Sequence, residues 1–101
     1  MPLPAIALPR AVVKFADQTI PIRSLSRGEA TRLIRDFAGD LDGQETWTIA
    51  CGTDVSEAEA AAWRQATDSG TVDGLTVAIL ELSGLTKKEG LDPQPSGSAS
   101  S

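Results

Sequence analysis

The sequence has no histidine and only one cysteine, Cys51, among its 101 residues. Histidine is the side chain most often used for proton transfer near neutral pH, and none is present to activate the thiol as a nucleophile. One thiol cannot form an intrachain disulfide, and alone it cannot provide a zinc-type ligand set. We therefore interpret Cys51 as a small core residue of a protein from a reducing compartment, and we expect no enzyme, no metal and no cofactor.

Aromatic side chains are also scarce, at 4% of the chain, and they are Phe15, Phe37, Trp47 and Trp63. The core must consist mostly of Ala, Val, Ile and Leu, which favours closely packed helices over a large β-sandwich. The two tryptophans are either core anchors, as this residue usually is, or contacts for a partner.

Long hydrophobic runs are missing as well. Residues 1–9 are apolar, but they contain three prolines and lack a basic start, so they do not resemble a signal peptide. No stretch approaches the roughly 20 apolar residues that span a bilayer. We expect a cytoplasmic protein with no membrane partner.

Charge is unevenly distributed along the chain, whose net charge is −5. Residues 1–27 contain four cations and one acid, whereas the remainder contains five cations and thirteen acids. A nucleic-acid binder presents a basic face to the phosphates, so the acidic remainder predicts no nucleic-acid partner. Its surface charge is typical of a protein that stays soluble.

The N-terminal part predicts a β-hairpin. Residues 11–15 and 19–24 are rich in β-forming side chains and flank the turn residues 16–18. Pro21 has no N–H to donate, so its strand is expected at a sheet edge or at a bulge.

The clearest helix is predicted over residues 26–38. Ser26 and Glu29 have the spacing of a capping box, and apolar residues follow at helical intervals. Gly39 suits a left-handed C-terminal cap.

Two shorter helices are predicted next. The second spans about residues 42–51 and is expected to end at Gly52. The third opens with another capping box, formed by Ser56 and Glu59, and its pattern fades at residues 68–70.

The fourth helix is predicted over about residues 71–83, with Gly84 closing it. Gly74, in its first turn, either permits a close approach of a neighbouring element or is simply tolerated.

The predicted fold is therefore mainly α, with four short helices and an N-terminal β-hairpin. We expect a flexible arm over residues 1–10, because prolines there prevent regular hydrogen bonding. A single helical domain that includes the hairpin is expected over residues 11–85. The Pro-, Gly- and Ser-rich residues 86–101 predict a disordered tail.

Three segments follow one another in a recognisable order. The first runs from Val13-Lys14-Phe15 through Thr19-Ile20-Pro21-Ile22-Arg23 to Ser24-Leu25-Ser26-Arg27-Gly28-Glu29. The second, Ile49-Ala50-Cys51-Gly52-Thr53-Asp54-Val55-Ser56, leads into the helix that contains Trp63. The third is Val77-Ala78-Ile79-Leu80-Glu81-Leu82-Ser83-Gly84-Leu85. Over about residues 12–88 the chain thereby resembles the tail assembly chaperones of long-tailed bacteriophages and prophages.

The resemblance implies a protein of the host bacterial cytoplasm that is absent from the mature virion. It implies two partners, the aggregation-prone tape measure protein and the tail tube protein, and also a self-oligomer. A longer isoform made by ribosomal frameshifting is implied near the end of the short form, where Lys87-Lys88 stands in this chain. No catalytic residues are implied.

An escort for a long helical partner needs an exposed apolar groove of moderate affinity. We predict that one face of the fourth helix, together with a tryptophan of the third, supplies this groove or an oligomer contact. The residues are Trp63, Val72, Leu75, Ile79, Leu82 and Leu85.

Two other functions remain open at this point. The first alternative is a structural or adaptor component of the phage virion, such as a head–tail or tail completion protein. The second is a small regulator, similar to an antitoxin, whose acidic surface meets a basic protein.

Overall fold

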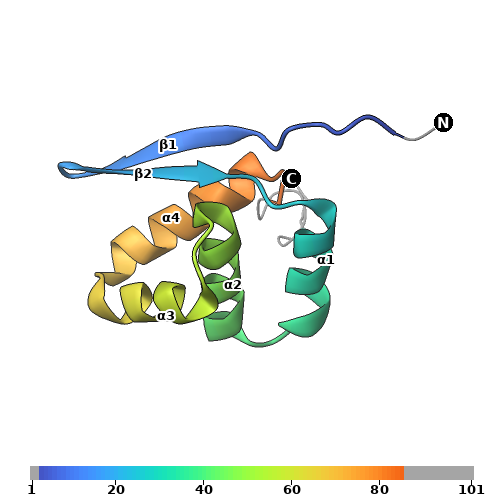
Figure 1. Cartoon of the computed structure of the whole chain (residues 1–101). Helices are drawn as coiled ribbons and strands as arrows, with labels where there is room; N and C mark the ends of the chain where they lie inside the picture. Colours follow the sequence, from blue (N-terminus) through green and yellow to red (C-terminus); the bar gives the residue numbers. More distant parts are fainter. Residues whose placement is uncertain (1–2, 86–101) are drawn as a thin grey trace, which may run out of the picture.

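The computed structural model describes residues 3–85, which form a two-stranded antiparallel sheet followed by four helices. This confirms the predicted mainly α fold with an N-terminal β-hairpin. The hairpin lies along one side of the helices, and α2 stands between α1 and the α3–α4 pair (Figure 1). The predicted tail over residues 86–101 lies outside the described residues.

The hairpin consists of β1 (Arg10–Phe15) and β2 (Gln18–Arg23), joined by the two-residue turn Ala16-Asp17. Ala16 has a φ of 55°, and two-residue hairpin turns require a positive φ at one or both of their central positions. The turn is shorter than predicted because Gln18 already belongs to β2.

The predicted N-terminal arm ends earlier than residue 10. Arg10 lies in β1, and the N–H of Ser24 donates to the carbonyl of Pro9 over 2.9 Å, so the ladder extends to Pro9. Residues 3–9 have no regular secondary structure. Pro21 lies opposite Val12 in a sheet of two strands, which confirms its predicted place in an edge strand.

Helix α1 (Arg27–Asp36) begins as predicted. The Oγ of Ser26 accepts a hydrogen bond from the N–H of Glu29 over 3.2 Å, and the Glu29 carboxylate accepts one from the N–H of Ser26 over 2.9 Å. Both halves of the capping box are therefore present. The helix is two residues shorter than predicted at its end, and Gly39 follows with a φ of 78°.

Helix α2 (Leu41–Thr53) is longer than predicted at both ends. It begins after Asp40, whose side chain accepts from the N–H of Gly43, and it continues through Gly52. The prediction that Gly52 ends this helix is wrong. A Cβ at Gly52 would lie 2.5 Å from the Cδ1 of Ile79, so the glycine instead allows close contact with α4.

The end of α2 is set by Asp54, which has a left-handed φ of 60°. The N–H of Val55 donates to the carbonyl of Ala50 over 3.0 Å, and that of Asp54 donates to Cys51 over 3.4 Å. This is the hydrogen-bond pattern of a Schellman cap, with aspartate in the position usually taken by glycine.

Helix α3 (Glu57–Ala66) begins at Ser56, whose Oγ accepts from the N–H of Glu59 over 3.1 Å. Among the described residues only this half of the predicted capping box forms. At its other end, Arg64 donates to the carboxylate of Glu45 in α2 over 2.8 Å, which ties the two helices together.

Helix α4 (Ser69–Leu82) begins two residues before its predicted start. The side chain of Asp68 accepts from the N–H of Thr71 over 3.0 Å, so the residues assigned to a fading third helix are the N-cap and first turn of the fourth. Gly84 has a φ of 77° and closes the helix as predicted.

The core lies where α2, α4 and the hairpin meet. Its most deeply buried side chains include Ile49, Ala60, Leu75 and Ile79, none more than 2% exposed. A Cβ at Gly74 would lie 3.1 Å from the Cε1 of Phe15, so this glycine permits a close approach between α4 and β1. Of the two readings of Gly74, the structure supports this one.

Candidate functional site

Three of the six predicted partner contacts lie in the core. Val72, Leu75 and Ile79 are 6%, 1% and 0% exposed. These side chains face inward because α4 packs against α2 and the hairpin. In this structure they form no exposed groove, and their apolar spacing is explained by core packing instead.

The other three predicted contacts, Trp63, Leu82 and Leu85, are half-buried and pack against the rim of the core. The N–H of Leu85 donates to the carbonyl of Leu80 over 2.7 Å, which completes the cap of α4. Part of each side chain is still accessible. Their contact with a partner stays a prediction.

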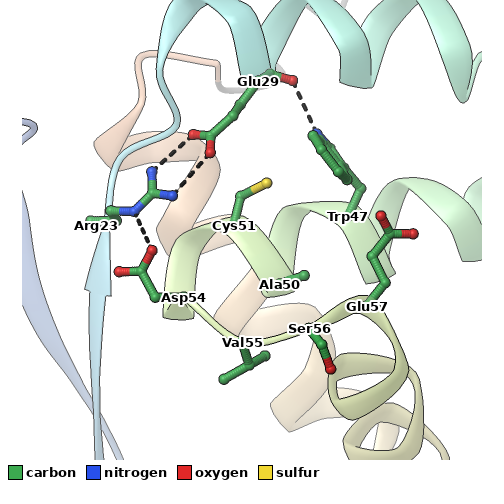
Figure 2. A pocket seen from close by; sticks show the side chains of 9 residues that line it. All are labelled: Arg23, Glu29, Trp47, Ala50, Cys51, Asp54, Val55, Ser56 and Glu57. Atoms are coloured by element: carbon green, nitrogen blue, oxygen red, sulfur yellow. Dashed lines mark hydrogen bonds and ion pairs between the residues drawn. The ribbon is translucent and has the colours of Figure 1, made fainter.

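A hollow of about 350 Å³ opens between β2, α1, α2 and the start of α3 (Figure 2). Its lining combines apolar and charged side chains. It is lined by Arg23, Glu29, Trp47, Ala50, Cys51, Asp54, Val55, Ser56 and Glu57. Three acids and one base give this lining a formal charge of −2.

Arg23 joins three elements at the hollow. Its guanidinium donates to both carboxylate oxygens of Glu29 in α1, over 2.8 and 2.9 Å, and its Nε donates to Asp54 at the end of α2 over 2.9 Å. Figure 2 shows the guanidinium between the two carboxylates. Because both partners occupy it, Arg23 is a tether between β2, α1 and α2 rather than a free anion-binding group.

The ion pair changes the protonation behaviour of both partners. The hydrogen bonds from Arg23 lower the pKa of Glu29 to about 2, against the opposing effect of burial. The same hydrogen bonds raise the pKa of Arg23. Glu29 therefore stays ionised at neutral pH and cannot act there as a general acid.

Trp47 forms one wall of the hollow and is half-buried. Its Nε1 donates to the carbonyl of Glu29 over 3.0 Å, its ring stacks on Phe37 with centroids 5.8 Å apart, and the guanidinium of Arg32 lies 4.5 Å from its ring centroid. The cation–π contact and the hydrogen bond fix the ring between α1 and α2. Trp47 is thus an anchor, as one of its two interpretations required.

Cys51 lies at the base of the hollow and is 8% exposed. Burial, reinforced by the charge of Glu29, raises the pKa of its thiol to about 12. The thiolate is the nucleophilic form, and it is scarcely populated at neutral pH. The interpretation of Cys51 as a small core residue is confirmed.

The sequence alone did not indicate this hollow. Arg23 was visible only as part of a basic N-terminal region, and Asp54 lies 31 residues away from it in the chain. The one available signal was that both belong to segments that carry the family resemblance. Glu29 was identified for its capping role, which it combines with the ion pair.

Comparison of the chain with protein-family models, curated proteins and solved structures gives no match. Within residues 3–85, no helix is long and apolar enough to cross a membrane. In the same part of the chain, no three acidic, cysteine or histidine side chains are grouped to hold a metal ion.

Proposed function

We propose that the chain is a tail assembly chaperone of a long-tailed bacteriophage or prophage, which binds the tape measure protein and aids assembly of the tail tube. It would act in the host cytoplasm, without catalysis, and be absent from the finished virion. The proposal rests on the family resemblance, because a fold alone does not determine a function.

One observation supports it most directly: the three segments that carry the resemblance contact one another. Arg23 of the first segment, which also pairs with Glu29 of that segment, forms an ion pair with Asp54 of the second. The N–H of Leu25, also in the first, donates to the Oγ of Ser83 in the third over 2.8 Å. Segments far apart in sequence therefore share one structural unit, as parts of a single inherited domain should.

The character of the hollow is consistent with a binding role. Its lining combines apolar and acidic side chains, and the pKa values of Glu29 and Cys51 are unsuited to proton transfer at neutral pH. An escort must also release its partner when the tail assembles, which favours a small contact area of moderate affinity.

The test is co-expression of the full chain with the long coiled-coil protein encoded nearest downstream, followed by solubility measurement and co-purification. We expect the long protein to be soluble only in the presence of this chain and to co-purify with it. A long protein that is soluble alone and forms no complex contradicts the proposal.

A matched pair of variants connects this test to the hollow. Glu57 lines the hollow, whereas Glu59 lies in the same first turn of α3 and does not. Because both acids lie near the N-terminus of the helix, replacing either with lysine should have a similar effect on helix stability. We expect Glu57→Lys to reduce co-purification and Glu59→Lys to leave it nearly unchanged.

The virion-component alternative predicts a different result in a separate experiment. Mass spectrometry of purified particles should detect a structural component at stoichiometric level and should not detect a chaperone. Presence of the chain in washed particles would favour the alternative over our proposal.

A further inference from the structure

The two edges of the hairpin differ in their capacity to pair with another strand. Because the N–H of Ser24 donates to the carbonyl of Pro9, these two residues occupy a hydrogen-bonded position of the ladder. Hydrogen-bonded and non-hydrogen-bonded pairs alternate in antiparallel sheets. In the observed register, the backbone groups of residues 10, 12 and 14 in β1 and 19, 21 and 23 in β2 therefore point away from the partner strand.

The outer edge of β2 is interrupted at its centre. The middle one of its three outward positions is Pro21, which has no N–H. A proline at this point is a common protection against strand addition. A second chain cannot form a continuous ladder along β2.

The outer edge of β1 has no such interruption. Its outward positions are Arg10, Val12 and Lys14, each with a free N–H and C=O, and no strand within residues 3–85 pairs with that side. Figure 1 shows β1 at the margin of the molecule, with β2 between it and α2. Pro9 does not interfere, because its missing N–H would have faced Ser24 of β2 rather than this edge.

The side chains along this edge define the chemistry of a partner. Residues 10, 12 and 14 alternate with the inward-facing Val13 and Phe15, so they share the outer face of the sheet. All three are exposed, Val12 to 66%. Within the described residues neither Arg10 nor Lys14 forms an ion pair.

We propose that the outer edge of β1 accepts an extended segment of another protein whose side chains alternate as acid, any residue, apolar, any residue, acid. The two acids would lie opposite Arg10 and Lys14, and the apolar residue opposite Val12. Opposite charges across neighbouring strands stabilise their pairing, and the backbone hydrogen bonds supply the affinity. This inference is independent of the proposed function, because a virion component could use the same edge.

The test uses the full chain labelled with ¹⁵N and the synthetic peptide Thr-Glu-Thr-Val-Thr-Glu-Thr. In the free protein we expect the amides of residues 10, 12 and 14 to exchange rapidly with solvent. On addition of the peptide, these amides should shift downfield and become protected. The matched peptide Thr-Lys-Thr-Val-Thr-Lys-Thr should bind at least about tenfold more weakly, as expected when each favourable charge pair becomes a repulsive one.

Two variants separate the backbone from the charges. Val12→Pro removes one outward N–H without affecting a bond to β2, and it should weaken glutamate-peptide binding about tenfold, whereas Val12→Thr keeps the N–H and should bind nearly as the parent does. The double variant Arg10→Glu, Lys14→Glu should reverse the preference and bind the lysine peptide.

Three outcomes would overturn the proposal. One is absence of glutamate-peptide binding at millimolar concentration, and another is equal binding of the two peptides. The third is retention of full binding by Val12→Pro. If Val12→Pro does not fold, the double variant Arg10→Glu, Lys14→Glu still tests the proposal through its expected preference for the lysine peptide.

Discussion

Helix α2 makes a close apolar contact with α4, and the residue that ends it forms an ion pair with β2. Against α4, Gly52 leaves room for the side chain of Ile79, which is 0% exposed. Near the same end of α2, Asp54 is joined to Arg23 by an ion pair whose side chains are 54% and 13% exposed. The first contact excludes water and tolerates no change of volume, whereas the second remains accessible to water, salt and protons. We therefore expect substitutions at the first contact to be far more costly, and salt to act only on the second.

The largest effect is expected for Ile79→Ala. Removing a fully buried aliphatic side chain loses its transfer free energy and leaves a cavity, which together cost about 2–5 kcal/mol. Chemical denaturation monitored by tryptophan fluorescence would measure this loss. Val77→Ala is the control, because Val77 is 43% exposed on the same helix and should change stability by less than about 0.5 kcal/mol. Equal losses for the two variants would contradict the assignment of Ile79 to the core.

Gly52→Ala is expected to have the next largest effect. The added Cβ would lie within 2.5–2.8 Å of three carbon atoms of Ile79. Overpacking of this kind costs about 1–3 kcal/mol, which exceeds the gain of alanine over glycine in a helix. Gly70→Ala, whose Cβ would meet only the flexible Asp68 side chain at 3.4 Å, should be neutral or stabilising.

The clash can be tested by relief of the crowding. Ile79→Val removes one methyl group next to Gly52, so the double variant Gly52→Ala, Ile79→Val should lose less stability than the sum of the two single variants. Simple additivity would show that the two residues do not compete for the same space.

These positions show which parts of the fold could be predicted from sequence. The capping box of Ser26 and Glu29 was found because the signal is local, and the helix begins where it predicts. Gly52 was misassigned as a helix end because a glycine also occurs at helix crossings, and only the position of Ile79 distinguishes the two. The Schellman cap was missed because Asp54, not glycine, adopts the left-handed conformation.

The candidate site was less predictable than the fold for the same physical reason. The hollow depends on contacts between residues distant in sequence, such as Trp47 with the carbonyl of Glu29 and Arg23 with Asp54. Conversely, the apolar periodicity of α4 was read as a partner surface although it fills the core. Spacing identifies an apolar face, but it does not show whether that face packs inward.

Acid should weaken the ion pair of Arg23 with Glu29 before it affects the core. The pKa of Glu29 is lowered from 4.5 to about 2 by Arg23, so its ionised form stabilises the fold, and this contribution is complete above pH 4.5 and lost as the pH falls toward 2. Since the Glu29 side chain is 25% exposed, we expect a loss of about 1–2 kcal/mol rather than the full value of the shift.

The control for this pH dependence is Arg23→Met, which removes the base and keeps much of its aliphatic volume. Its stability should already be lower at neutral pH and should fall less between pH 4.5 and 2, when urea denaturation is measured across that range. Parallel curves for the parent and Arg23→Met would assign the acid sensitivity to other carboxylates.

Asp54→Gly is expected to have the smallest effect, because it changes two contributions to the free energy of unfolding that have opposite signs. Glycine adopts the left-handed conformation of this position without the strain that a φ of 60° imposes on aspartate, a gain of up to about 1 kcal/mol. The variant also loses the ion pair with Arg23, and with Asp54 54% exposed this costs about 0–1 kcal/mol. We expect a net change within about 0.5 kcal/mol in urea denaturation at low salt, shifting toward stabilisation in 1 M salt, where the lost ion pair is screened. A loss above 2 kcal/mol at either salt concentration would mean that the exposed end of the Arg23 network holds α2 as firmly as the core does.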